Sequence, residues 1–243
     1  MSEKDVSSVT DRIEGALERL ILDGEILPGA KINENALAAR FGISRAPVRE
    51  ACRLLQRSGL VDIVPNKGSF VRAHTLAEIV GLFDIRACLG RLAGQLAAVA
   101  ISRDGLAEMT RLMGEMDRAS RSADAERYIG LNIEFHAALF AATGNARLAA
   151  IDAQIGKELR IYRQHGLEFG GGLAVSNVEH QAIYAAIEGG RCEAAGDEFE
   201  RHIQNGRDRF IRATTATGRL VLKTDPPAKS ASDKSASDKS AKR

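Results

Sequence analysis

Four arginines recur at every fourth position in the first third of the chain: Arg45, Arg49, Arg53 and Arg57. Residues four apart lie on one face of an α-helix, so this spacing predicts a continuous basic stripe. Arginine pairs well with phosphate groups and with guanine edges, so the stripe has the chemistry of DNA binding. A solvated helix face is the alternative, and the surrounding segments must decide between the two.

A second group of polar residues lies in the other two thirds of the chain. Asn132 and His136 are four residues apart and therefore share a helix face, and His180 and His202 follow far downstream. Neutral imidazole is a good ligand for zinc and nickel. Three widely separated histidines are equally compatible with ordinary core or surface positions. From the residues alone, both interpretations stay open.

The segments before the arginine stripe predict two helices. Apolar residues recur at helical spacing over residues 9–23, and a second helix is expected to begin at Asn33 or Glu34. Gly42 marks a tight turn, and Ser44 is the expected N-cap of the arginine helix. The pattern is that of a helix-turn-helix.

The segments after the stripe predict a β-hairpin. Two short β-rich runs, residues 60–64 and 69–71, are separated by a Pro-Asn-Lys-Gly turn. Residues 40–72 hold seven Lys or Arg against two Asp or Glu, so basic charge is concentrated here although the whole chain has a net charge of only +2. We therefore expect a winged helix-turn-helix DNA-binding domain over residues 1–72.

The remainder of the chain predicts helices. A short hinge, residues 72–75, leads into six segments with helical periodicity and glycine-marked connections: 76–101, 104–120, 124–143, 146–166, 174–188 and 192–216. Such a series predicts an antiparallel all-helical bundle over residues 76–217, and a mainly α fold class for the chain. The basic tail 218–243 repeats Ser-Ala-Ser-Asp-Lys and is expected to be disordered.

The composition excludes several classes. No apolar run is long enough for a transmembrane helix, and the N-terminus lacks the layout of a signal peptide. The three cysteines are far apart, which argues against a disulfide framework. We expect a cytoplasmic protein with no membrane partner.

Several segments resemble the GntR family of bacterial transcription regulators. They are residues 27–38, 42–51, 59–61 and 66–71, and they include the run Ser-Arg-Ala-Pro-Val-Arg-Glu-Ala and the wing Gly-Ser-Phe-Val. The rest of the chain is similar to the FadR-type subgroup, which has an all-helical FCD ligand-binding domain. Its matching segments are 82–86, 132–136 with 144–145, 179–189 and 201–202. The resemblance covers roughly residues 8–215.

Two positions depart from the subgroup's pattern. Gly90 stands where the family usually has a glutamate four residues after Arg86, so an ion pair within that helix is not expected. Asn132 stands where the metal ligands of the subgroup often include an aspartate. A neutral amide oxygen is the weaker ligand.

The GntR resemblance implies that the arginine helix enters the major groove. Arg45 and Arg49 are expected to contact base edges, where one bidentate arginine–guanine pair contributes about 1–3 kcal/mol of discrimination. Arg53 and Arg57 are expected at phosphates or at the surface. The remaining DNA contacts are expected from helix termini, helix two and the wing tip: Ser44, Asn35, Arg40, Lys67 and Gly68. The family also implies a homodimer on a palindromic operator.

The FCD resemblance implies a metal site with zinc or nickel, held by Asn132, His136, His180 and His202. A small carboxylate effector would bind such a metal, with its other end held by Arg86, Arg160 or Arg163. Ion pairs between helices are an equally good expectation for Arg160 and Arg163. His74 and His165 do not fit the set and are expected in solvent.

Two other functions compete with a ligand-responsive repressor. One is a metal-dependent hydrolase with a three-histidine site; against it, Glu134 lies two residues from Asn132 and on a different helix face, so no general base is evident. The other is a DNA-binding dimer without a small ligand. In the favoured hypothesis, effector and metal tie the third, fifth and sixth bundle helices together. They thereby change the angle at the hinge and the spacing of two recognition helices.

Overall fold

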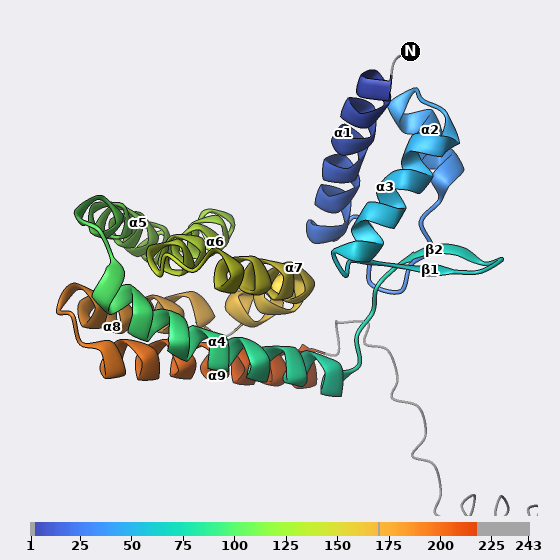
Figure 1. The fold of residues 1–243 in the computed structure, drawn as a ribbon. Coiled ribbons are helices and arrows are strands. Elements are labelled where there is room, and N and C mark those ends of the chain that lie inside the picture. The colour runs from blue at the N-terminus through green and yellow to red at the C-terminus, as the bar shows by residue number, and fades with distance from the viewer. Residues whose placement is uncertain (1–2, 170, 218–243) are drawn as a thin grey trace, which may run out of the picture.

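The computed structural model describes residues 3–169 and 171–217, without the side chains of residues 3–8, 161, 164 and 165. Figure 1 shows a smaller part, built from three helices and a hairpin, beside a larger helical part. In chain order the elements are α1 Glu3–Leu22, α2 Glu34–Phe41, α3 Arg45–Arg57, β1 Val61–Val64, β2 Gly68–Val71, α4 Leu76–Ala100, α5 Arg103–Arg121, α6 Ala125–Ala142, α7 Ala146–Glu168, α8 Gly172–Glu188 and α9 Cys192–Thr217.

The smaller part is held together by the packing of α1 on α3. Leu17, Val48 and Leu55 are completely buried between them, and each such side chain contributes about 1.5–3 kcal/mol. Helix α1 begins before the expected position 9 because residues 3–8 carry no apolar stripe to reveal it. Helix α2 ends at Gly42, whose φ of 65° is the left-handed conformation that glycine adopts without strain.

The hairpin forms the wing. Strands β1 and β2 are antiparallel, with Val61 opposite Val71 and Val64 opposite Gly68. An isolated bridge between Lys31 and Phe70 adds the segment before α2 to the edge of β2. The wing is therefore fixed to the start of α2, and both lie beside α3 in Figure 1.

The larger part is the expected bundle of α4–α9, and each helix agrees with its predicted bounds to within two residues at either end. Helices α4 and α9 lie side by side along their length. Gly94 makes this approach possible, because a Cβ there would collide with the backbone carbonyl of Ala195. Phe135 and Phe199 are fully buried in the centre. The mainly α fold with a winged helix-turn-helix and a helical bundle is confirmed.

The expected hinge is tied to α7. The His74 backbone N–H donates to the Tyr162 hydroxyl at 3.3 Å, and His74 Nε2 lies 3.5 Å from a Glu158 carboxylate oxygen. Thr75 then caps α4 through reciprocal hydrogen bonds with Glu78. The expectation that His74 lies in solvent is wrong: its side chain is buried because α7 covers it. The hinge between the wing and the bundle is therefore held by contacts with α7 in addition to the covalent chain.

Two expectations concern other parts of the chain. The basic tail, residues 218–243, and the side chain of His165 lie outside the described residues. Among the described helices, none combines the length and apolar character needed to cross a membrane.

Candidate functional site

A groove of about 900 Å³ separates α3 from the wing. Arg45, Arg49 and Arg53 line its helix side, and Lys67 and Gly68 line its wing side. The start of α2 contributes Asn35. The groove therefore brings together most of the residues expected to contact DNA, and it presents them on one face with a basic character that suits phosphate groups.

The carboxylate of Glu34 lies close to both arginines that are expected to contact bases, Arg45 and Arg49. A Glu34 carboxylate oxygen lies 3.6 Å from Arg45 Nη2 and 3.7 Å from Arg49 Nε, while the other oxygen accepts a hydrogen bond from Ser69 Oγ at 3.2 Å. The two arginine side chains remain 56% and 55% exposed. The sequence analysis missed Glu34, because its contacts depend on the packing of α2 against α3 and the wing.

The N-terminus of α3 lies where Ser44 predicted it. Ser44 has extended backbone geometry at the N-cap, and within the described residues its side chain caps no backbone amide. The first-turn N–H groups of α3 are therefore available for an acceptor from outside. The helix dipole makes a phosphate oxygen the favoured acceptor.

The other arginines of this region differ in their relation to the groove. Arg40 does not line the groove and pairs with Glu25 at 3.4 Å. Arg53, expected at a phosphate or at the surface, lines the groove and pairs with Glu50 at 3.0 Å. Arg57 is not among the lining residues. The structure therefore distinguishes Arg53, which lines the groove, from Arg57, which does not. Their regular spacing in the sequence could not show this difference.

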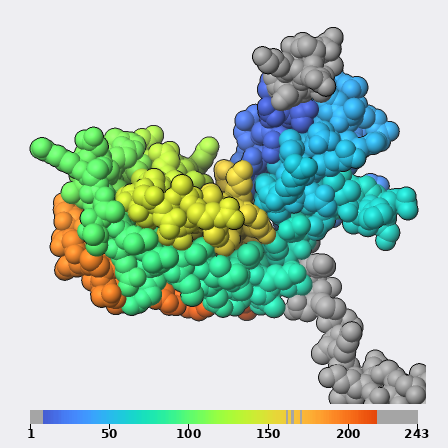
Figure 2. All heavy atoms as spheres, in the orientation of Figure 1, coloured from blue at the N-terminus to red at the C-terminus, as the bar shows by residue number. Residues whose placement is uncertain are grey.

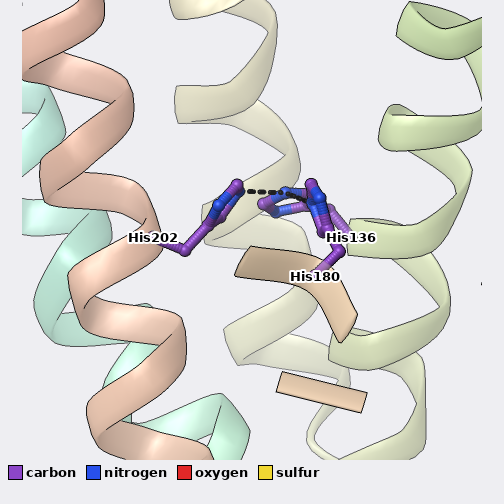
Figure 3. Close-up of side chains that lie close together, drawn as sticks. All are labelled: His136, His180 and His202. Carbon is purple, nitrogen blue, oxygen red and sulfur yellow. Dashed lines mark hydrogen bonds between the residues drawn. The ribbon is translucent and has the colours of Figure 1, made fainter. Parts of the chain in front are cut away.

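The three bundle histidines converge. His136 of α6, His180 of α8 and His202 of α9 point toward one another in Figure 3, and their ligand nitrogens all lie within 4.8 Å of one another. His136 Nε2 is 3.2 Å from His202 Nε2 and 3.3 Å from His180 Nε2. All three side chains are buried. Three helices far apart in sequence therefore form one imidazole cluster.

The outer nitrogens of two of these rings have acceptor partners. His180 Nδ1 lies 2.7 Å from the Ser176 carbonyl oxygen, and His202 Nδ1 lies 2.7 Å from a Glu179 carboxylate oxygen. Because these oxygens only accept, Nδ1 must carry the proton in both rings and Nε2 must carry the lone pair. Arg209 binds both oxygens of Glu179 at 2.7 and 2.9 Å and holds it in place.

His136 has the opposite environment. Its Nδ1 lies 3.1 Å from Nη2 of Arg86, which can only donate, so His136 accepts there and carries its proton on Nε2. Arg86 in turn binds Asp152 of α7 at 2.6 Å. An ion pair within α4 is absent among the described contacts, as the loss of glutamate at Gly90 implied, but α7 supplies the carboxylate instead. A Cβ at position 90 would collide with Ile203 of α9.

The cluster fits a divalent metal ion. Asn132 lines one cavity with His202 and another with His136, and its buried Oδ1 has no hydrogen-bond partner in the described part of the chain. An orphaned amide oxygen beside three imidazoles is a donor set that suits zinc or nickel. Binding would also require the proton on His136 Nε2 to leave.

Burial sets the electrostatics of the cluster. It lowers the pKa of His136 and His180 well below 6.5, and that of His202 to about 4, because the charged imidazolium is poorly solvated there. Burial opposes ionisation of Glu179, yet hydrogen bonds from His202 and Arg209 lower its pKa to about 2. The histidines are therefore neutral, and the Nε2 lone pairs of His180 and His202 are available to a metal. Glu134, the carboxylate considered as a general base in the hydrolase alternative, is exposed.

A cleft of about 400 Å³ opens beside the cluster, between α6 and α7. Arg86, Arg160 and Arg163, the three expected effector residues, all line it, together with Asn132 and His136. Arg86 is occupied by Asp152, and Arg160 lies 3.6 Å from Asp23 of α1. The described contacts include no hydrogen bond or ion pair of Arg163; burial and the charge of Arg86 lower its pKa, and the nearby carboxylate of Asp152 opposes that shift. An anion in the cleft would supply the missing partner.

Two family descriptions match the chain over these same parts. "Bacterial regulatory proteins, gntR family" matches residues 9–71, and "FCD domain" matches residues 81–205. The chain belongs to the GntR family. A gntR domain implies DNA binding, and an FCD domain implies a small-molecule effector and often a metal. This GntR chain is therefore a transcription regulator and not an enzyme.

Curated relatives agree with this assignment. An HTH-type transcriptional regulator in an unstable DNA locus of Streptomyces ambofaciens is 32% identical over 77% of this chain and 79% of its own length. The "Probable D-xylose utilization operon transcriptional repressor" of Paenarthrobacter nicotinovorans is 26% identical over 81% of this chain and 86% of its own.

Solved structures show the same architecture. A GntR transcriptional regulator of Rhodococcus sp. RHA1 has a TM-score of 0.70 at 26% identity, covering 85% of this chain and 99% of its own. McbR/YncC of E. coli has a TM-score of 0.73 at 21% identity, covering 84% and 97%. The GntR fold thus extends over the winged part and the bundle.

Proposed function

We propose that this GntR regulator is a cytoplasmic repressor that binds a palindromic operator as a homodimer. Residues 1–72 would read the DNA, and residues 76–217 would bind the effector and dimerise. The observation that carries this proposal is the groove in which Arg45 and Arg49 face the wing. A single recognition helix and wing span few base pairs, so two copies are needed for a specific site.

In this proposal Arg45, Arg49 and Arg53 enter the major groove, and Lys67 and Gly68 follow the backbone or minor groove. Ser44 and the free amides of α3 bind a phosphate. Glu34 releases the arginines when DNA provides stronger partners. Asn35, which lines the groove, contacts the DNA backbone, whereas Arg40, which lies outside the groove, contributes at most at its edge.

We further propose that the effector is a small carboxylate bound in the cleft beside the histidine cluster. His136, His180, His202 and the amide oxygen of Asn132 would hold a zinc or nickel ion. That ion would supply positive charge and an open coordination position for a carboxylate oxygen. Arg163, which has no described partner, would bind the acid directly.

The operator assignment is tested by Arg49→Ala. Using duplexes that the wild-type chain selects from random DNA, we expect about 10- to 100-fold weaker binding in a gel-shift assay, the loss of one bidentate base contact. Arg57→Ala, on the same helix but outside the groove, is the matched control and should bind nearly as well as wild type. Circular dichroism and size-exclusion chromatography check fold and dimer. Unchanged affinity of Arg49→Ala would remove α3 from the recognition role.

The metal assignment is tested by thermal unfolding. Zinc or nickel should raise the Tm of chelator-treated protein, because the ion binds only the folded chain. The absence of any response to chelator, zinc or nickel would favour a pocket without metal.

A further inference from the structure

The effector cleft is shared by both parts of the molecule. Most of its lining comes from α6 and α7, but Glu18 and Leu22 of α1 close part of its rim. Helix α1 belongs to the DNA-reading part, and its C-terminal end approaches α7 in Figure 1. In Figure 2 the gold atoms of α7 lie against the blue atoms of α1. A ligand in this cleft would therefore touch the DNA-reading part directly.

The chemistry of the cleft changes from one side to the other. Its inner side holds the cation of Arg163, and two buried atoms that line the cleft, Asn132 Oδ1 and Arg160 Nε, lack hydrogen-bond partners in the described chain. The flanking walls are mostly apolar, with Ile129 and Phe140 from α6 and Ala149 from α7, while the charged side chains of Lys157 and Arg160 line the cleft toward α1 and pair with its carboxylates. A hydroxyl placed against such walls would lose its hydrogen bonds to water without replacement. The cleft therefore suits one anionic group on an apolar body.

Helix α7 connects this cleft to the DNA-reading part at several points. Lys157 Nζ lies 2.8 Å from Glu18, and Arg160 lies 3.6 Å from Asp23. Two residues further along, the Tyr162 hydroxyl accepts a hydrogen bond from the backbone N–H of His74 in the hinge. The same helix presents Arg163 to the cleft. A ligand that occupies the cleft thus contacts the element that positions α1.

We propose that the effector is a monocarboxylate with an apolar body, and that it changes operator affinity by acting on the contact between α1 and α7. The carboxylate accepts hydrogen bonds from Arg163 and Arg160, and the apolar body lies along the α6 and α7 walls and reaches Leu22. The inference rests on the effector site proposed above. The ligand acts because its affinity differs between arrangements of α1 on α7.

Two acids of similar size serve as probes: 4-phenylbutyrate, whose body is apolar, and gluconate, whose body carries hydroxyls. Calorimetry with the full chain should give binding of 4-phenylbutyrate at least about tenfold tighter than of gluconate, since the hydroxyls find no partners on the walls. Equal or tighter binding of gluconate would overturn the apolar-body assignment. If the wild-type chain binds neither acid, the effector site itself is wrong.

A cleft-filling variant locates the binding. Gly156 lines the cleft, and a Cβ added there meets no atom within 4 Å, so Gly156→Leu should fill the cleft without a backbone clash. We expect it to abolish binding of 4-phenylbutyrate. Gly130→Leu places the same side chain at an exposed position of α6 that is equally open, and it should bind normally. Undiminished binding by Gly156→Leu would place the acid elsewhere.

The double variant Asp23→Lys/Tyr162→Phe tests whether acid binding is coupled to DNA affinity, separately from acid binding itself. Neither residue lines the cleft, but the pair removes two ties between α7 and the DNA-reading part and adds repulsion against Arg160. We expect 4-phenylbutyrate to change the affinity of the wild-type chain for selected duplex several-fold, in fluorescence anisotropy. The double variant should bind the acid equally well yet lose most of that change.

Asp11→Lys, the same charge reversal at an exposed position of α1, is the matched control and should keep the full response. A wild-type response in the double variant would overturn the coupling through α7, while leaving the effector site intact. Acid binding without any change in the DNA affinity of the wild-type chain would overturn it as well.

Discussion

The DNA-reading groove and the histidine cluster bind charge in different ways. In the groove, Arg45 and Arg49 are more than half exposed and share one carboxylate at distances beyond a hydrogen bond. In the cluster, Arg86 is almost fully buried and binds Asp152 at 2.6 Å. Exposed charges exchange partners cheaply, whereas buried ones must keep theirs. In the proposed function, Arg45 and Arg49 can therefore exchange Glu34 for DNA, whereas Arg86 keeps Asp152 and holds the geometry beside the cluster.

The largest effect that this contrast predicts comes from Arg86→Met. The variant leaves Asp152 buried without its cation and His136 without its donor, so we expect the free energy of unfolding to fall by about 3–5 kcal/mol. Urea unfolding followed by circular dichroism measures it. Arg111→Met, which breaks ion pairs at an exposed position of α5, should be nearly neutral. Similar losses in the two variants would contradict the distinction between buried and exposed pairs.

Glu179→Gln sharpens the role of the cluster as a metal site. Glu179 accepts a hydrogen bond from the Nδ1–H of His202. This hydrogen bond orients the ring and makes Nε2 more basic. We expect zinc and nickel to bind about 10- to 100-fold more weakly, in competition with a chromophoric chelator. Glu188→Gln, the same change at an exposed end of α8, is the control. Unchanged metal affinity would show that His202 does not ligate through Nε2.

The buried histidines also predict acid lability of the metal-free bundle. Their pKa values in the folded chain lie below the ordinary 6.5, so the unfolded chain binds more protons. The stability from keeping them neutral is complete above about pH 6.5 and decreases as the pH falls below it. Each histidine contributes a slope of at most about 1.4 kcal/mol per pH unit. Urea unfolding of chelator-treated His180→Gln should therefore depend less on pH between 6.5 and 5 than wild type; equal slopes would contradict it.

Sequence reasoning predicted the two regions unequally well, and locality explains why. Ser44 predicted the first residue of α3, and the arginine spacing predicted its exposed face, because cap and periodicity are properties of neighbouring positions. The partner of Arg86 could not be predicted, since Asp152 is 66 positions away and meets it only when α4 packs on α7. Glu179 was visible beside His180 in a matching segment. Its role required knowing that α8 and α9 place it against His202.

The smallest expected effect concerns the groove. Glu34 is largely buried, and its negative charge faces the surface where DNA phosphates would lie. Glu34→Gln keeps the shape and the contact with Ser69 but removes that charge. Binding to random-sequence duplex should become a few-fold tighter, within the 0–1 kcal/mol of exposed ion pairs. Affinity for selected duplex should rise less, because Glu34 also holds Arg45 and Arg49 in place for bases. The ratio of specific to non-specific binding, measured by anisotropy at one salt concentration, should therefore fall.

A rise in that ratio would mean that Glu34 opposes recognition and does not orient the arginines. Glu50→Gln, next to Arg53 but outside the groove lining, provides the matched change of charge.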